Sequence, residues 1–168
     1  MTVPREKRLI ADYIAERFPN DHVIMGCPLG PVPESIIAQY GFRQAIRVAR
    51  GIRPEVDALV IRKAQLVLVE AKIFKWLDGI AKLPVYGGLV TSTPELQPYR
   101  DLERRLILCT PWTSENVQAA ANAQGVTIDI YNPPWIAAYV DETHKYWTKE
   151  YRDKRDEKMR LRKILGLE

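Results

Sequence analysis

Two carboxylates and a lysine lie in a pair of apolar segments that are separated by a short turn. Asp57 belongs to the first segment, and Glu70 and Lys72 belong to the second; both segments are rich in Val, Ile and Leu. This composition is typical of strands that are buried on both faces. The two segments are therefore predicted to form a β-hairpin whose turn is centred between Lys63 and Ala64.

A loop of even length at this turn places Asp57 directly across from Glu70. Lys72 shares their face of the sheet, because side chains two residues apart in a strand point the same way. Two facing carboxylates in an apolar sheet repel each other and lose hydration, which is costly. A divalent cation relieves both costs, since Mg²⁺ prefers hard oxygen ligands and often binds carboxylates together with phosphate. The pair thus predicts a metal site for phosphodiester chemistry.

Two alternatives limit this interpretation. A Glu-x-Lys sequence on an exposed strand is commonly a solvated charge pair, although the apolar flanks here favour a buried site. A loop of three residues would shift the pairing by one residue and separate Asp57 from Glu70.

With Asp57 on one strand and Glu70-Ala71-Lys72 on the next, the chain resembles the PD-(D/E)XK nuclease superfamily. The resemblance implies an α-β-β-β-α-β core over residues 4–131. It also implies that both carboxylates and the carbonyl of Ala71 hold Mg²⁺ (or Mn²⁺), while Lys72 polarises or helps to deprotonate the attacking water. The Pro of the family motif does not directly precede the Asp in this chain.

The resemblance also implies accessory residues on two helices. Many members of the superfamily carry a further Glu on the first helix that completes the metal site; Glu6 is preferred here, with Glu16 and Glu34 as alternatives. Related exonucleases carry Gln-x-x-x-Tyr on the helix that follows the hairpin. Here Lys82 replaces the Gln, so that only Tyr86 corresponds. Lys82 is a candidate phosphate contact or an ordinary solvated lysine.

A basic cluster precedes the hairpin and fits nucleic acid. Its arginines recur at intervals of three and four residues, which aligns them on one face if a helix extends that far. Arginine suits phosphate oxygens without reading base sequence, whereas the plainer interpretation is a solvated face. The members of the cluster are Arg43, Arg47, Arg50 and Arg53.

Composition sets wider limits. The 168 residues carry a net charge of +4, a mild preference for polyanions. Two cysteines in apolar settings indicate a reducing compartment, so the cytoplasm or a virion is expected. No apolar run reaches the length of a membrane span. The chain also lacks the sequence patterns of a zinc-binding Cys pair, a phosphate-binding Gly-Lys loop and a His-dependent triad.

The order of predicted elements indicates an α/β fold with a central mixed sheet flanked by helices. Gly41 is a weak point in one predicted helix, and Pro84 and Gly87-Gly88 are expected to interrupt another. Besides the hairpin, helices are predicted over 4–18, 34–49, 75–90 and 114–123, and strands over 22–27, 104–109 and 126–131.

Residues 136–168 are predicted to form a helical extension of a domain over residues 1–135. The tail from Tyr139 to Leu165 reads as one charged helix, with Tyr139, Trp147 and Tyr151 along one stripe. Its mixed charges favour a solvated helix or a partner contact over DNA binding, so a homo-oligomer or a larger assembly is a possible use.

The sequence therefore predicts a metal-dependent nuclease, with DNA as the expected substrate. The alternative is a nuclease-like fold that serves as a structural or DNA-binding component, for example of a phage assembly, with little or no catalysis.

Overall fold

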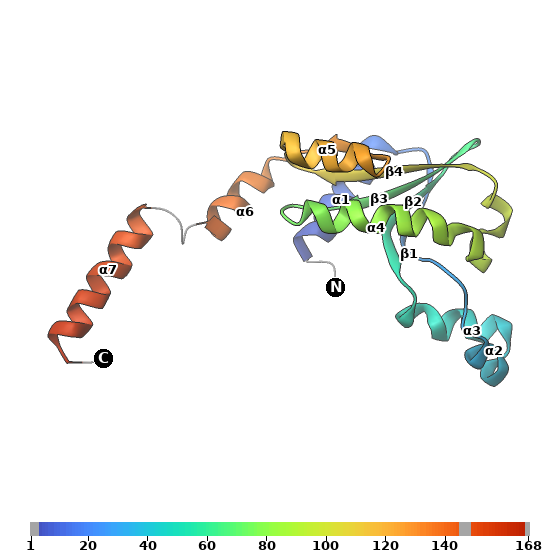
Figure 1. The fold of residues 1–168 in the computed structure, drawn as a ribbon, viewed down its shortest axis with the longest axis horizontal. Helices are drawn as coiled ribbons and strands as arrows, with labels where there is room; N and C mark the ends of the chain where they lie inside the picture. The colour runs from blue at the N-terminus through green and yellow to red at the C-terminus, as the bar shows by residue number, and fades with distance from the viewer. Residues whose placement is uncertain (1–3, 145–148, 167–168) are drawn as a thin grey trace. The chain divides into compact units, whose positions relative to one another are not determined.

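A computed structural model describes residues 4–144 and 149–166. Its centre is a five-stranded sheet in the order β1-β2-β3-β4-β5 (Figure 1). The first three strands are antiparallel, and the last three are parallel. This arrangement confirms the predicted mixed α/β sheet. The strands are β1 (His22–Pro28), β2 (Glu55–Ile61), β3 (Gln65–Ala71), β4 (Glu103–Thr110) and β5 (Val126–Ile130).

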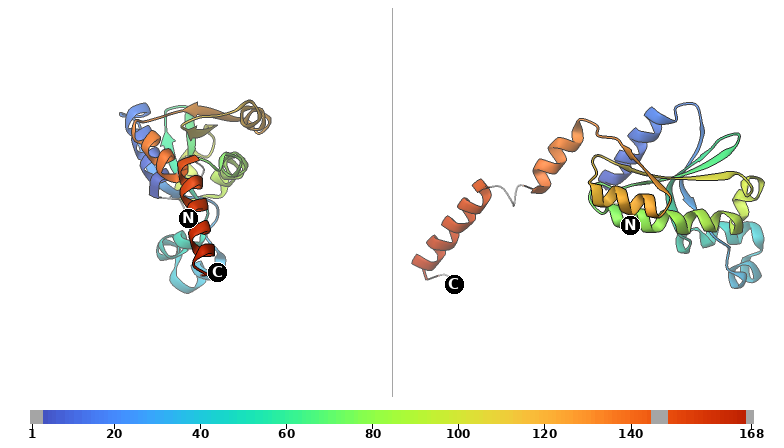
Figure 2. Two further views of the ribbon diagram at one scale, coloured as in Figure 1. Left: turned by 90° about the vertical axis from the view of Figure 1, so that its left-hand side faces the viewer. Right: turned by 45° about the horizontal axis from the view of Figure 1, so that its top comes forward.

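Helices cover both faces of the sheet (Figure 2). α1 (Pro4–Arg17) packs on β2 and β3 from one side, and α4 (Trp76–Leu89) and α5 (Glu115–Ala123) pack on the other. Leu66 and Leu68 belong to the core beneath α4, whereas the alternating Val67 and Val69 face the opposite side. Burial of the central strands on both faces explains their uniformly apolar sequence.

An insertion of short helices connects β1 to β2. It contains α2 (Glu34–Tyr40), α3 (Phe42–Val48) and the 3-10 helix η1 (Ala49–Ile52). Gly41 ends α2 and starts α3 with a φ of 73°. Glycine adopts such a positive φ without strain, so the predicted helix over 34–49 is split at its weak point.

α4 corrects one expectation, because it runs without a break through Pro84 and both of its late glycines. The residues on its inner face, among them Ile80 and Leu83, lie in the core, and this burial offsets the hydrogen bond that proline cannot donate. Gly87 serves packing, since a Cβ there would lie 3.3 Å from Leu106 Cδ2. Two further 3-10 helices that the sequence did not predict follow α4: η2 (Val90–Ser92) and η3 (Pro94–Tyr99).

The chain divides into two compact units, residues 1–132 and 133–168. The described part of the second unit is helical, with α6 (Trp135–His144) and α7 (Lys149–Ile164) in the range of the predicted tail helix. α7 has no buried residue. Trp147, which was expected on the stripe of the tail, lies outside the described residues. No helix within the described ranges is long and apolar enough to cross a membrane.

The two cysteines are free and buried in different layers. Cys27 belongs to the core cluster beneath α4, whereas Cys109 follows the α4-facing Leu108 and so points to the α1 side of the sheet. Burial raises the pKa of Cys27 to about 11 and raises the pKa of Cys109 further above its usual value.

Candidate active site

The β2–β3 hairpin has the register that the sequence predicts. Its ladder ends at the pair Ala58–Val69, so Asp57 and Glu70 are the next pair beyond it. There the Asp57 amide donates to Glu70 Oε1 at 3.2 Å, and the Ala71 amide donates to Asp57 Oδ2 at 3.0 Å. At this end of the hairpin, side-chain hydrogen bonds thus take the place of backbone ones. Each carboxylate accepts a hydrogen bond from a backbone amide of the opposite strand.

Glu6 and Lys72 complete a buried charge cluster. Lys72 Nζ lies 3.3 Å from Glu6 Oε2 and 3.6 Å from Glu70 Oε2. Glu6 Oε1 also accepts a hydrogen bond from the Ile73 amide at 3.3 Å. The first helix therefore delivers Glu6 across the end of β3, where it holds the lysine. The two alternative acids, Glu16 and Glu34, are exposed.

The electrostatics of the cluster follow from its burial and its three acids. Burial and the charge of Asp57 raise the pKa of Glu70 to about 8, although Lys72 acts in the opposite direction. Burial lowers the pKa of Lys72, but Glu70, Glu6 and Asp57 together outweigh it, so the net shift is upward. Lys72 is therefore a protonated counter-ion for a crowded set of carboxylates.

α4 contributes the two remaining predicted residues. Burial, followed by the charges of Glu70 and Asp57, raises the pKa of Tyr86 to about 12, which places its hydroxyl within the field of the carboxylates. Lys82 is exposed and bonds Asp78 at 2.8 Å; this bond raises the pKa of Lys82, with smaller contributions from Glu70 and Asp57. Both side chains thus lie on the side of α4 that faces the site.

Gly79 allows α4 to approach the strand that carries the cluster. A Cβ at this position would lie 2.6 Å from Leu108 Cδ1 and 3.0 Å from Lys72 Cγ. Only a glycine leaves room for the lysine stem between helix and strand. The sequence analysis did not predict this role for Gly79. A glycine in the first turn of the helix that follows the hairpin could have indicated it.

The donor set at the end of the hairpin fits a hard divalent cation. Asp57 and Glu70 present carboxylate oxygens from adjacent strands. The Lys72 amide donates to Cys109 O on β4, so the neighbouring Ala71 directs its amide and carbonyl toward β2 and Asp57. Among the described residues, no group of three or more His, Cys, Asp or Glu is placed to hold a metal ion. Two carboxylates suit Mg²⁺, which fills its remaining positions with water and phosphate oxygens.

The prediction that Arg53 belongs to a nucleic-acid-binding cluster is wrong, because Arg53 is buried. It is only 7% exposed, and its guanidinium bonds Glu95 at 2.6 and 2.9 Å and the Pro28 carbonyl at 3.3 Å. These contacts commit Arg53 to the interior and withdraw it from any phosphate. Its partner is 42 residues away in sequence, so local spacing gave no sign of the pair.

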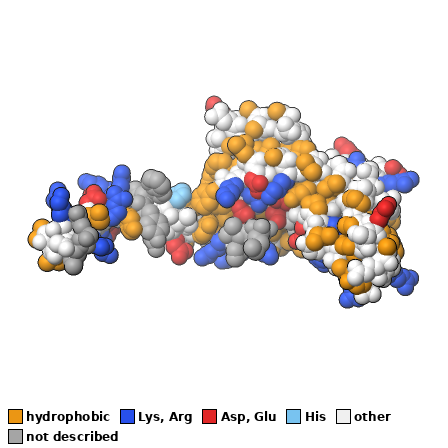
Figure 3. Space-filling model, turned by 60° about the horizontal axis from the view of Figure 1, so that its bottom comes forward, with side chains coloured by type: hydrophobic (Ala, Val, Ile, Leu, Met, Phe, Trp, Pro, Cys, Tyr) orange, Lys and Arg blue, Asp and Glu red, His pale blue; other side chains and the backbone are white. Residues whose placement is uncertain are grey.

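The other three arginines are exposed. Arg43 and Arg47 lie on α3, and Figure 3, with α2 and α3 at its right, shows basic side chains at the margin of this part. Arg50 lies on η1 and donates to the Gly26 carbonyl at 3.0 Å. The expected single helix face is thus divided between two helical segments.

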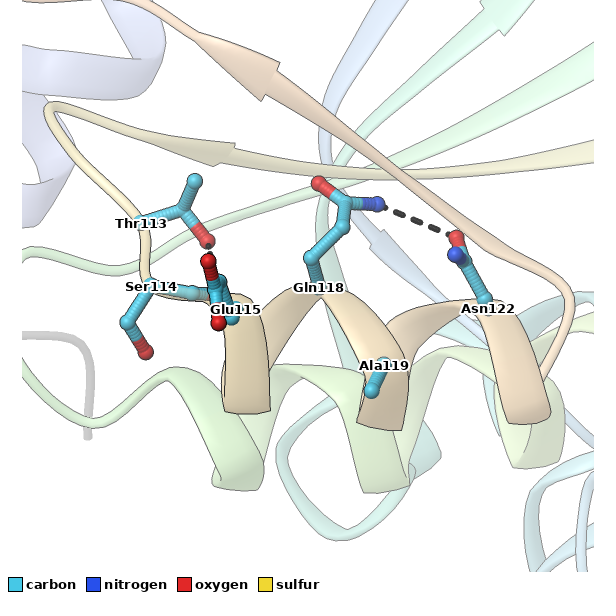
Figure 4. Close-up of a pocket in the computed structure, with 6 residues that line it drawn as sticks. All are labelled: Thr113, Ser114, Glu115, Gln118, Ala119 and Asn122. Atoms are coloured by element: carbon cyan, nitrogen blue, oxygen red, sulfur yellow. Dashed lines mark hydrogen bonds between the residues drawn. The ribbon is translucent and has the colours of Figure 1, made fainter.

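A shallow hollow on the outer side of α5 lies apart from the charge cluster (Figure 4). Within it Gln118 donates to Asn122 Oδ1 at 3.0 Å. Its one ionisable side chain, Glu115, is exposed, so the hollow offers a single solvated carboxylate and no buried charged group. It is lined by Thr113, Ser114, Glu115, Gln118, Ala119 and Asn122.

Comparison with known proteins gives little further information. No protein family model matches the chain, and no curated protein matches it. Among solved structures, the crystal structure of a repair endonuclease from Pyrococcus abyssi is similar at 17% sequence identity and a TM-score of 0.49. The match covers 80% of this chain and 50% of that one, so the chain spans about half the length of that protein. We draw no chemistry from a likeness of this degree.

Proposed function

We propose that this protein is a metal-dependent nuclease that hydrolyses phosphodiester bonds, with DNA as its substrate. The observation that carries the proposal is the facing pair of Asp57 and Glu70 at the end of the hairpin, with Lys72 beside it. Burying two facing acidic side chains costs free energy of folding without a ligand, because both lose hydration and their charges repel each other. A role in binding a cation explains why the fold keeps it.

The roles of the chain's own residues follow from the contacts. Asp57, Glu70 and the Ala71 carbonyl would hold Mg²⁺ (or Mn²⁺), which when bound neutralises phosphate charge and supplies an activated water. Glu6 holds Lys72 in place, and the protonated amine stabilises negative charge that develops at the phosphate. Lys82, whose exposed side chain lies on the side of α4 toward the site, would contact the same phosphate.

Exposed arginines on α3 support nucleic acid as the substrate. Arg43 and Arg47 lie on a short helix that leads through η1 into β2 and Asp57. Guanidinium groups there would contact backbone phosphates on either side of the cleaved bond without selecting a sequence.

The test is cleavage of supercoiled, linear and single-stranded DNA with Mg²⁺. Asp57→Asn keeps an acceptor for the Ala71 amide while removing the charge, and we expect cleavage to fall at least about a hundredfold, as for loss of a metal-held step worth several kcal/mol. Glu103→Gln is the control, because Glu103 accepts from Gln65 at the opposite end of β3.

Three outcomes are decisive. Cleavage by wild type and Glu103→Gln but not by Asp57→Asn supports the proposal. Cleavage that survives Asp57→Asn refutes the assigned site. DNA binding without cleavage by any variant favours the alternative of a nuclease-like DNA-binding component.

A further inference from the structure

α7 carries a charge excess as large as that of the whole chain. Its 16 residues hold eight Lys and Arg against four Asp and Glu, and the full chain holds 25 against 21. The remainder of the chain is therefore electrically balanced. Figure 3 shows basic side chains gathered along α7, at the left of that view.

The charges on α7 are also segregated around the helix. In an α-helix, residues three and four apart are neighbours on the surface. Arg155, Lys158 and Arg162 have no Asp or Glu at any of these positions, and with Tyr151 they follow one another at spacings of four, three and four. We call Arg155, Lys158 and Arg162 the basic stripe. Of the four acids, Glu150, Asp153 and Glu157 lie on the other side, and Asp156 lies beside Arg155.

Two ion pairs on α7 involve its exposed surface. Lys154, which borders the acids, bonds Glu150 at 2.7 Å, and Arg155 lies 3.3 Å from Asp156. The side chains of the second pair are 62% and 65% exposed, and ion pairs that are so exposed exchange readily with other ligands. Lys158 is exposed and lies between the two arginines.

We infer that the basic stripe of α7 binds the phosphate backbone of nucleic acid, independently of base sequence. This inference rests on the proposed function and adds a second contact to it. The mixed charges of the tail favoured a solvated or partner-binding helix, but three of the four acids of α7 lie away from the stripe. The stripe extends over about 10 Å along the helix axis, and each DNA strand places one phosphate about every 3.4 Å along the duplex axis.

An anionic membrane surface is the competing ligand, and the apolar residues of α7 argue against it. A helix that lies in a membrane interface gathers its apolar side chains on one face. Here the exposed apolar side chains are divided: Leu161 and Ile164 are three residues apart and adjoin, whereas Met159 is two residues from Leu161 and faces another way.

The test is binding of a fluorescent DNA duplex at several salt concentrations, with EDTA present so that metal-dependent cleavage does not proceed. The triple variant Arg155→Gln, Lys158→Gln, Arg162→Gln removes the stripe. The control Lys149→Gln, Lys154→Gln, Arg160→Gln removes the same charge from residues that each have an acid three or four positions away. Glutamine keeps helix propensity, and circular dichroism verifies the helix.

We expect the stripe variant to bind about tenfold or more weakly at low salt, and its plot of log K against log salt to flatten by up to about 2.7. The control is expected to retain the wild-type slope. An equal loss in both variants, or in neither, overturns the inference. Binding of wild type to vesicles of anionic lipid but not to DNA also overturns it.

The cleavage assay separates this inference from the proposed function. If the stripe variant still cleaves at saturating DNA but binds like wild type, only the inference fails. If DNA binds through the stripe while no variant cleaves with Mg²⁺, only the proposed function fails.

Discussion

Lys72 occupies the position of a counter-ion among three carboxylates. Its ammonium lies within 3.6 Å of both Glu6 and Glu70. Burial and then the charge of Asp57 raise the pKa of Glu70, and Lys72 only partly offsets them. A divalent cation would complete the neutralisation and make the hairpin end more stable.

Added metal is therefore expected to raise the melting temperature. At a concentration of 100 times its Kd, Mg²⁺ or Mn²⁺ would add about 2.7 kcal/mol, which corresponds to several degrees. Differential scanning fluorimetry with metal and with EDTA measures this shift. Asp57→Asn is expected to abolish it, while Glu103→Gln keeps it; a shift of the same size in Asp57→Asn contradicts metal binding at the pair.

The Arg53–Glu95 pair predicts a specific dependence on pH. Burial acts to raise the pKa of Glu95, but the hydrogen bonds from Arg53 outweigh it and lower the pKa below its usual 4.5. A lowered folded-state pKa stabilises the protein above about pH 4.5, and this stability is lost as pH falls through the folded value. Glu95→Gln is expected to lose about 2 to 3 kcal/mol at pH 7, because it leaves Arg53 buried without its partner.

Urea denaturation at pH 7 and below pH 4 measures this effect. The difference between wild type and Glu95→Gln should shrink as the pH falls below 4.5 and through the lowered folded-state pKa of Glu95, because protonation removes the charge that Arg53 pairs with. Glu150→Gln, which breaks an exposed pair, should leave stability unchanged at both values. A difference that stays constant with pH would show that the charge of Glu95 does not contribute to stability through Arg53.

Local sequence pattern predicted one of these sites and not the other. The register of Asp57 and Glu70 follows from two apolar runs and a short turn, all within residues 55–71, where alternation fixes which side chains face each other. Arg53 looked like its exposed neighbours in spacing. Its burial depends on Glu95, which only the folded chain brings near.

At the scale of elements, Gly79 determines how closely α4 approaches the strands that carry the site. Gly79→Ala adds a methyl group that meets Leu108 and Lys72. We expect a loss of about 1 to 3 kcal/mol from overpacking, despite the better helix propensity of alanine. Cleavage should fall as well, since the lysine stem must move.

Gly88→Ala is the matched control in the same helix. A Cβ at Gly88 meets nothing within 4 Å, so the substitution is expected to stabilise the protein by up to about 1 kcal/mol through helix propensity alone. Thermal unfolding of both variants tests the pair. A Gly79→Ala variant as stable and active as Gly88→Ala contradicts the close approach.

The elements themselves were largely predictable, with failures at proline and at the short 3-10 helices. Strong apolar periodicity located α1, the hairpin and β4 to within about a residue or two. Pro84 was expected to interrupt α4, but packing of the inner face against the sheet overrides the local preference. The 3-10 helices around Leu96 have no periodic signal because they are too short to show one.

At the scale of the whole molecule, the site residues and the sheet lie within residues 1–132. α7 has no buried residue, so its removal uncovers no core. A chain that ends at His144 is expected to melt within a degree or two of the full chain and to cleave at saturating DNA with the same rate.

The same truncation should weaken DNA binding at low salt as much as the stripe variant does. Calorimetry and fluorescence anisotropy measure the two properties separately. A large drop in melting temperature would show that α7 contributes to the stability of the fold, against its exposure.

The two buried thiols provide a built-in probe of how the layers open. A thiol reacts with alkylating reagents as its thiolate and only when it is exposed, and both conditions are suppressed for Cys27 and Cys109 in the closed fold. Because one thiol lies beneath α4 and the other faces the α1 layer, their labelling rates in the native protein report the detachment of each layer separately. Mass spectrometry of the two cysteine peptides would therefore rank the local stability of the two faces without any introduced label.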